Sequence, residues 1–362
     1  MGARLREAVA SLADYPARDL NDDGIAVRLH RNEGALPPPA FVVDAVRGID
    51  AETLRTYPTA LQREALALLA ARFDREPDDV VLANGADELL AACARIALDP
   101  GEVAAGATPA FGMYARVVAL AGGRLQSIPY AERWTFRAQA LIERAGARTR
   151  LVFLSHPNNP TTDPLRAEDL ATIANALPNA LIVVDEVYLA FSDRSLAREA
   201  AAFENVAVIG SFSKCASLAG ARVGYALAKA PVAAALRRCL GPYPVSALSL
   251  VAARAYLADP IRTRAFELAL QEQIGRSLDE LESAFLPFAR EIWRGPANFL
   301  LADCGARATA LRDALLERGI AVRTFDDPAL AGTIRACAAS DADTAVALAA
   351  LRALAAEQIA HA

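Results

Sequence analysis

Cysteine and histidine are scarce in this chain of 362 residues, and their scarcity excludes several kinds of site. The five cysteines are scattered, odd in number and never form a C-x-x-C pair. They therefore predict neither a disulfide framework nor a zinc site, and they favour a reducing cytoplasm. The only histidines are His30, His156 and His361, too few for a metal cluster or a Ser-His triad. We expect no metal and interpret His156 as a loop residue.

The chain also lacks a run of Lys or Arg and a long apolar run. Its 38 basic and 43 acidic residues give a formal charge of −5, and no basic segment suits a nucleic-acid backbone or an acidic membrane surface. Its apolar runs are Ala-rich, short and interrupted by charge, and no basic region followed by an apolar one opens the chain. We expect a globular protein that binds neither nucleic acid nor membrane and is not exported.

Short β-branched runs alternate with helix-like stretches through much of the chain. The runs that predict strands are Val80–Ala83, Leu151–Ser155, Leu181–Asp185, Val206–Gly210 and Val223–Leu227. This alternation is typical of an α/β fold with a mostly parallel central sheet flanked by helices.

The character of the sequence changes near Ser246, where long helical segments begin, including one from roughly Ile261 to Phe285. A short strand near Asn298 to Ala302 and further strand-helix alternation follow. We predict an N-terminal helix and extended arm over 1–39, a large α/β domain over 40–244 and a smaller α+β domain over 245–362.

Polar clusters follow the predicted strands, where ligands of open α/β sheets bind. Asn84-Gly-Ala-Asp-Glu88 is a small-residue turn before an apolar helix, and its N–H groups suit a phosphate, although such a turn is also a routine helix cap. In His156-Pro-Asn-Asn-Pro-Thr161 two prolines hold Asn158 and Asn159 in a stiff loop. This loop is either an ordinary turn or a source of amide donors for a cofactor phenolate.

Asp185 ends a run of four apolar residues, so its carboxylate needs a cationic partner if it is buried. The protonated ring nitrogen of pyridoxal phosphate is such a partner, and Tyr188 could add a hydroxyl at the ring edge. The alternative is that Asp185 caps a turn and Tyr188 packs in the core.

Lys214 lies 29 positions after Asp185, among small and apolar residues where an amine can lose its proton and form a Schiff base. Ser211, Ser213 and Arg222 surround it in sequence and could hold one phosphate together. A nucleophilic amine, an anion cradle and a buried carboxylate are what pyridoxal phosphate requires of a protein.

These motifs, in this order, resemble those of the fold-type I pyridoxal phosphate aminotransferases nearly end to end, and within them the histidinol-phosphate aminotransferase branch. Ser211-Phe-Ser-Lys214 through Arg222 is similar to the lysine motif of that family, His156 to Thr161 to its Asn-Asn-Pro-Thr-Gly loop, and Val184 to Tyr188 to its Asp-Glu-Ala-Tyr strand end. Gly241-Pro-Tyr-Pro-Val-Ser246 resembles an element typical of the branch.

The resemblance implies a role for each site residue. It assigns Lys214 to catalysis and implies that the cofactor is bound by Gly85, Ala86, Asp87, Phe111, Asn159, Asp185, Tyr188, Ser211, Ser213 and Arg222, with Tyr57 supplied by the other subunit of a homodimer. It implies that the substrate is bound by Arg335, Asn159, Arg323, Tyr15 and Arg18.

The implied activity is a ping-pong transamination of L-histidinol phosphate and 2-oxoglutarate to imidazole-acetol phosphate and L-glutamate, a step of histidine biosynthesis. Lys214 would carry the proton between substrate and cofactor while Asp185 keeps the ring cationic. The fold leaves open an aminotransferase for aromatic or other L-amino acids, a decarboxylase of a phosphorylated amino acid, or a non-catalytic pyridoxal-binding protein.

The chain departs from the family pattern mostly near the substrate. His30 stands where Asn is usual, and Gly34 ends a segment that normally continues as Asn-Glu-Asn-Pro. Thr162 replaces a Gly, Ser211 replaces a common Thr, and Ala336-Cys-Ala338 replaces Thr-Val-Gly. We expect the departures at His30 and Ala336 to affect the choice of amino donor.

Overall fold

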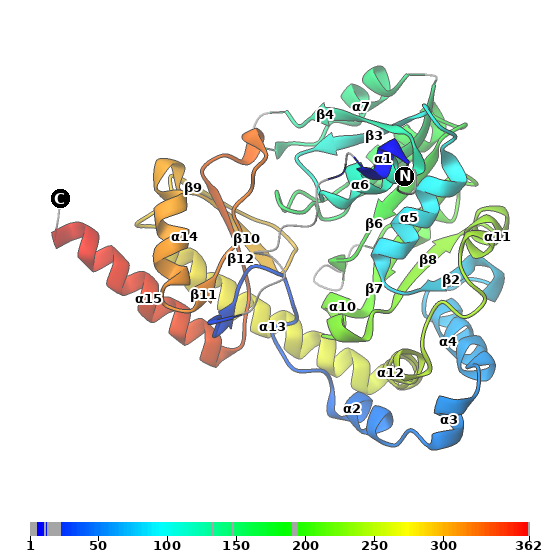
Figure 1. Cartoon of the computed structure of the whole chain (residues 1–362), viewed down its shortest axis with the longest axis horizontal. Helices are drawn as coiled ribbons and strands as arrows, with labels where there is room; N and C mark the ends of the chain where they lie inside the picture. The colour runs from blue at the N-terminus through cyan, green and yellow to red at the C-terminus, as the bar shows by residue number, and fades with distance from the viewer. Residues whose placement is uncertain are drawn as a thin grey trace, which may run out of the picture.

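The computed structural model describes residues 6–10, 12, 23–131, 134–146, 148–189 and 195–360. A seven-stranded sheet with the order β2-β8-β7-β6-β5-β3-β4 organises the larger part of the molecule (Figure 1). Its strands are β2 (Val80–Ala83), β3 (Val103–Thr108), β4 (Arg124–Pro129), β5 (Thr149–Ser155), β6 (Leu181–Asp185), β7 (Val206–Ser211) and β8 (Gly224–Ala228). Neighbouring strands are parallel except where β8 pairs with β2 and β7. The expected α/β class with a mostly parallel sheet is confirmed.

Two strands of this sheet were not predicted from the sequence. β3 reads Val-Ala-Ala-Gly-Ala-Thr and β4 reads Arg-Leu-Gln-Ser-Ile-Pro, so neither is rich in β-branched residues. Alanine and glycine have low intrinsic strand preference. β3 is a strand because it lies between β4 and β5 and pairs with both, which no local pattern reveals.

Alternate residues of the central strands face two separate cores, as the two-residue period of a strand requires. Ile182 and Val184 of β6 lie in one core and Val183 in the other. The first core is covered by α2 (Ala40–Arg47), α4 (Thr59–Arg72), α7 (Ala138–Ala145), α8 (Ala167–Ala176), α9 (Ala197–Ala200) and α12 (Ala247–Ala258). The second is covered by α5 (Ala86–Ala97), α6 (Met113–Ala121) and α11 (Ala230–Cys239).

A smaller antiparallel sheet with the order β12-β10-β9 lies on the other side of the molecule (Figure 1). It consists of β9 (Glu291–Arg294), β10 (Phe299–Asp303) and β12 (Thr333–Cys337), and its core includes residues of α13 (Pro260–Phe285), α14 (Ala308–Leu316) and α15 (Asp341–Ala360). The long helix α13 runs from α12 to this sheet, and Phe266 packs against the cores of both parts. Its bounds agree closely with the predicted helix.

The domain boundaries remain a prediction, and packing suggests how to place them. Most of the buried residues of α12 belong to the core of the large sheet, so the predicted boundary at 244 precedes a helix that packs with the large part. Val27, Leu29 and Ala35 pack instead in the core of the small sheet. We propose that the large domain extends through Ala258 and that residues 27–35 pack with the small domain.

The N-terminal arm begins with the short helix α1 (Glu7–Ala10), and β1 (Val27–Arg28) pairs in parallel with β11 (Ile320–Ala321) of the small domain. A second short helix, α3 (Ala51–Arg55), leads from α2 to α4. Tyr15 and Arg18 lie outside the described residues. None of the helices described has both the length and the apolar character needed to cross a lipid bilayer.

Candidate active site

The ends of three neighbouring strands gather the predicted site residues. Ser155 at the end of β5 pairs with Asp185 at the end of β6, and Asp185 pairs with Ile209 of β7. Because these strands are parallel, the chain segments that follow them meet at one edge of the sheet. The loop that carries Asn159, the carboxylate of Asp185 and the turn that carries Lys214 therefore lie together.

Lys214 lies in a short helix, α10 (Phe212–Cys215), immediately after β7. Its Nζ donates a hydrogen bond to the backbone carbonyl of Arg31, 2.9 Å away, in the N-terminal arm. Burial lowers the pKa of the Lys214 amine to about 8. Part of this amine, about a tenth at pH 7 and about half at pH 8, is therefore neutral, as a nucleophile or proton carrier must be.

Asp185 is a buried carboxylate that no cation from the described residues neutralises. Oδ2 accepts a hydrogen bond from the hydroxyl of Tyr114 at 2.8 Å, and Oδ1 accepts one from the backbone N–H of Val187 at 3.1 Å. Burial raises the pKa of Asp185 to about 6, against the opposing effect of these two hydrogen bonds. A buried carboxylate held mostly in its anionic form at neutral pH is complementary to a protonated ring nitrogen.

Tyr114 is a site residue that the sequence reasoning missed. Its ring stacks on Phe153 with centroids 4.7 Å apart, and Phe111 meets it edge-on at 5.9 Å. Tyr114 ends the segment Pro109-Ala-Phe-Gly-Met-Tyr114, in which only Phe111 was assigned a role. The available signal was a tyrosine on the first turn of α6, three residues after Phe111, which the resemblance assigned to cofactor binding.

A chain of hydrogen bonds connects the small sheet to the loops that follow the strands of the large sheet. Arg335 of β12, which is buried, donates from Nη1 to Oδ1 of Asn159 at 2.6 Å, and Nδ2 of Asn159 donates to the hydroxyl of Tyr188 at 3.2 Å. Arg335 also donates from Nη2 to the backbone carbonyl of His30 at 2.5 Å. The guanidinium is thus fixed next to the loops of the large sheet and near the arm.

The predicted phosphate-binding groups meet across β8. Gly224 pairs with Ser211 on one side and with Ala83 on the other, so the turn before α5 lies beside the turn before α10. Gly85 precedes α5 with a φ of 84°, and a Cβ at Gly224 would lie 2.5 Å from the backbone carbon of Gly85. Small residues therefore keep open the approach to the N-terminus of α5, where free N–H groups favour an anion.

Side chains complete this cradle. The Oγ of Ser211 donates to the Oγ of Ser213 at 2.9 Å and accepts from the backbone N–H of Ser213 at 3.1 Å. Arg222 extends its guanidinium to Asp87 at 3.2 Å, and its side chain is 44% exposed. Ala86, at the start of α5, presents only a methyl group. The cluster combines hydroxyls, backbone donors and one cation, the usual composition of a phosphate site.

Tyr57, Tyr15 and Arg18 need separate mention. Tyr57 is 77% exposed and stacks on Tyr243 with centroids 4.5 Å apart, so it is not among the gathered side chains of its own chain. Tyr15 and Arg18 fall outside the described residues. Arg323 does lie beside the site, since its backbone exchanges two hydrogen bonds with that of Arg335.

Two departures from the family pattern have a structural reason. Thr162 adopts a φ of 67°, a conformation that glycine adopts without strain, which accounts for a glycine being usual there. A Cβ at Gly34 would lie 2.1 Å from Oγ of Ser217, so the larger side chain of the usual segment has no room. At His30 the structure shows a role for the backbone carbonyl, which any residue supplies.

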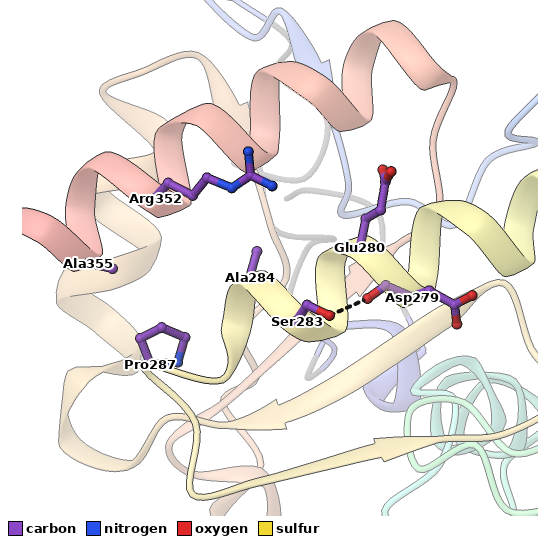
Figure 2. A pocket seen from close by; sticks show the side chains of 7 residues that line it. All are labelled: Asp279, Glu280, Ser283, Ala284, Pro287, Arg352 and Ala355. Atoms are coloured by element: carbon purple, nitrogen blue, oxygen red, sulfur yellow. Dashed lines mark hydrogen bonds between the residues drawn. The ribbon is translucent and has the colours of Figure 1, made fainter.

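A hollow of about 410 Å³ between α13 and α15 lies apart from this constellation (Figure 2). It is lined by Asp279, Glu280, Ser283, Ala284, Pro287, Arg352 and Ala355, and none of the side chains described above lines it. Asp279 pairs with Arg294, and Ser283 bonds to the backbone of Asp279 within the helix. Two of its polar residues, Asp279 and Ser283, therefore make contacts within the small domain.

The family model "Aminotransferase class I and II" matches residues 26–351. The chain belongs to this family. The aminotransferase is 33% identical to the histidinol-phosphate aminotransferase of Symbiobacterium thermophilum over 82% of this chain and 81% of that protein. It is 34% identical to histidinol-phosphate aminotransferase 2 of Pseudomonas fluorescens Pf-5, over 86% of this chain and 84% of that protein.

Solved structures agree with this assignment. The aminotransferase superposes on histidinol-phosphate aminotransferase from Sinorhizobium meliloti in complex with pyridoxal-5'-phosphate with a TM-score of 0.88, at 27% identity over 98% of this chain and 99% of that chain. Aspartate aminotransferase from Thermus thermophilus with maleate shares the fold, with a TM-score of 0.83 at 22% identity over 96% and 99% of the two chains. The expected fold type, enzyme class and resemblance are confirmed.

The described residues fit the cofactor that the sequence led us to expect, pyridoxal phosphate. The buried carboxylate of Asp185 suits its ring nitrogen, the partly neutral amine of Lys214 suits its aldehyde, and the glycine-lined start of α5 suits its phosphate. The aminotransferase is therefore a pyridoxal-phosphate enzyme. The role of each individual side chain remains a proposal.

Proposed function

We propose that this aminotransferase transfers the amino group of L-histidinol phosphate to 2-oxoglutarate, giving imidazole-acetol phosphate and L-glutamate. The observation that carries the proposal is the buried Arg335, which Asn159 and the His30 carbonyl hold beside the segment that contains Lys214. A planar guanidinium binds either a carboxylate or a phosphate with two hydrogen bonds, so one residue serves both amino donors. The relatives named for this reaction support the choice.

Each side chain has a defined task in this proposal. Lys214 would carry the proton between the substrate carbon and the bound cofactor, because burial lowers the pKa of its amine to about 8 and leaves part of it neutral. Asp185 would hold the ring nitrogen protonated, and Tyr188 and Asn159, which hydrogen-bond to each other, would serve the phenolate oxygen. The cofactor, when bound, supplies the electron sink. Phe111 would pack on its ring, and the residues around α5 and α10 would hold its phosphate.

The proposal includes a homodimer. Leu54, Tyr57, Tyr243 and Leu248 are exposed apolar side chains from α3, α12 and the segments beside them. Exposed apolar patches favour association. We propose that a second copy covers them and that Tyr57 reaches the phosphate site of that copy. We also propose a cytoplasmic location, which is consistent with five free cysteines.

A second candidate, an aminotransferase for aromatic L-amino acids, is favoured by one observation. The guanidinium of Arg335 lies 5.4 Å from the ring centroid of Phe299 and 5.8 Å from that of Phe325. Aromatic rings beside the anion site offer an apolar surface to an aromatic substrate, whereas a dianionic phosphate requires additional cations. Arg323, whose guanidinium carbon lies 5.9 Å from the same Phe325 ring, is the nearby candidate for such a cation.

Single-turnover spectra of the holoenzyme with L-histidinol phosphate, L-glutamate and L-phenylalanine distinguish the two. We expect rapid loss of the visible absorbance with the first two and slow loss with phenylalanine. Arg335→Leu should slow the reactions of L-histidinol phosphate and L-glutamate by about 30-fold or more, because truncating a buried charge contact costs about 2–5 kcal/mol. Arg276→Leu, which removes an exposed ion pair on α13, is the control. Phenylalanine reacting fastest would favour the second candidate.

A further inference from the structure

Tyr188 has an unusual set of hydrogen bonds. Its hydroxyl oxygen accepts from Nδ2 of Asn159 at 3.2 Å and also from Nδ2 of Asn32 at 3.0 Å. Asn159 is oriented by Arg335, which donates to its Oδ1, so its NH₂ group must face Tyr188. Both lone pairs of the hydroxyl are therefore engaged, and the O–H proton finds no acceptor among the described residues. The hydroxyl of Tyr188 can therefore donate its hydrogen bond to a bound ligand.

Asn32 is a residue of the N-terminal arm for which neither the sequence nor the family pattern suggested a role. It is 1% exposed and adopts a φ of 54°, in the left-handed region that asparagine tolerates better than most residues. Its Nδ2 donates to the hydroxyl of Tyr188. Few residues adopt this conformation, so we expect the contacts around Asn32 to hold it there.

The small domain provides that restraint. Asn298, fully buried immediately before β10, donates from Nδ2 to the backbone carbonyls of Asn32 at 3.2 Å and Glu33 at 3.1 Å. Asn298 thus positions the arm, the arm positions Asn32, and Asn32 contacts Tyr188. The chain of contacts connects the small sheet to the ring edge of the cofactor site.

The physical effect of Asn32 is on the donor strength of the Tyr188 hydroxyl. Burial raises the pKa of Tyr188, while the charge of Arg335 and the hydrogen bond from Asn32 act against this rise. Asp185 and Cys337 are the other titratable groups that act on it, and both raise it. A donor to the tyrosine oxygen makes the O–H more acidic and strengthens the hydrogen bond it gives to an anionic oxygen.

We propose that Asn32 is a positioning residue that makes Tyr188 a stronger hydrogen-bond donor to the phenolate oxygen of pyridoxal phosphate. Asn298 sets the arm so that this contact forms. The inference rests on the proposed function only in requiring that the cofactor binds. It does not depend on which amino donor the enzyme prefers.

The test is the pH midpoint of the visible absorbance of the holoenzyme, measured without any amino donor. A weaker hydrogen bond to the phenolate raises this midpoint. Asn32→Gly removes the amide and tolerates the positive φ, so we expect a rise of about 0.5 to 1 pH unit, or roughly three- to tenfold in proton affinity. Asn32→Asp places an acceptor beside the hydroxyl, so it should raise the midpoint at least as far.

Further variants separate this effect from a general loss of structure. In a Tyr188→Phe background, Asn32→Gly should cause no additional shift, because the two residues then act as one unit. Asn298→Asp should also raise the midpoint, because it loses the amide donor to the carbonyls of Asn32 and Glu33. This variant tests the inference if the Asn32 variants do not fold. Asn205→Asp, which loses amide bonds to the carbonyls of Ala174, Leu177 and Ala180, should cause no shift.

An unchanged or lowered midpoint in Asn32→Gly would overturn the inference, as would an equal shift in the Tyr188→Phe background. Failure of histidinol phosphate to react, with the midpoint shifts as expected, would instead count against the proposed substrate alone.

Discussion

At the scale of single residues, the site depends on two ionisable groups, Asp185 and Lys214, that are buried and form no ion pair among the described residues. Asp185 and Lys214 both have pKa values shifted by burial, Asp185 upward to about 6 and Lys214 downward to about 8. Each shift disfavours the charged form. Between these two values the carboxylate is mostly ionised while part of the amine is neutral, and a cofactor with a cationic ring and an aldehyde needs both conditions.

Tyr114 should matter most at acidic pH. Its hydroxyl lowers the pKa of Asp185, so Tyr114→Phe should raise that pKa above about 6 and leave the carboxyl protonated over a wider range. We expect the affinity of the apoprotein for pyridoxal phosphate to fall by roughly tenfold or more near pH 6, since a hydrogen bond to a charged group contributes about 1.5–3 kcal/mol. The loss should shrink as the pH rises past the new pKa.

Titration of the apoprotein with cofactor at several pH values measures this effect. Tyr130→Phe is the matched control, because Tyr130 is a half-buried tyrosine whose ring contacts Phe136. A loss of affinity in Tyr114→Phe that is the same at every pH would contradict the explanation.

At the scale of elements, close packing between β8 and the start of α5 forms the anion cradle. Gly224→Ala would place a Cβ 2.5–2.6 Å from the backbone of Gly85 and Ala86, which cannot move without displacing α5. We expect a loss of about 1–3 kcal/mol in the free energy of unfolding, the usual cost of overpacking, together with weaker cofactor binding. Denaturant unfolding and cofactor titration measure the two effects.

Gly220→Ala provides the control in the same segment. A Cβ there would meet no atom within 4 Å, so this variant should change neither stability nor cofactor affinity appreciably. Equal behaviour of the two variants would indicate that the approach of β8 to α5 is not what keeps the cradle open.

Some strands could be predicted from the sequence, and two could not. The five predicted strands rich in β-branched residues were found, and their ends carry the predicted site residues. β3 and β4 were missed because their sequences lack strand preference and are ordered only by pairing. Tyr114 was missed for a similar reason, since nothing local indicates that its hydroxyl meets a carboxylate 71 positions away.

At the scale of the whole molecule, the proposed dimer makes a direct prediction. Lys214→Ala has no amine for catalysis, and Tyr57→Ala would lack the phosphate contact that it supplies to the other subunit. In a mixed dimer, the site with intact Lys214 receives Tyr57 from the Lys214→Ala chain, so one native site is restored. We expect the mixture to be more active than either variant alone once the subunits exchange.

Assays of the mixed variants, with the mass in solution measured alongside, test this arrangement. Mixed dimers without recovered activity would show that Tyr57 does not act across the interface. A single-chain mass at every concentration would argue against the dimer itself.

The sequence by itself determined the fold class, the enzyme family and the order of the cofactor motifs, because these depend on residue types at fixed positions after strands. It named Lys214, Asp185, Asn159, Tyr188 and Arg335 before their contacts were known. Only the tertiary structure decided that Tyr114 holds Asp185, that α12 packs with the large sheet, and that Asn32 and Asn298 connect the arm to Tyr188. These are contacts between distant segments, and their geometry arises only when the two sheets, the arm and α13 pack together.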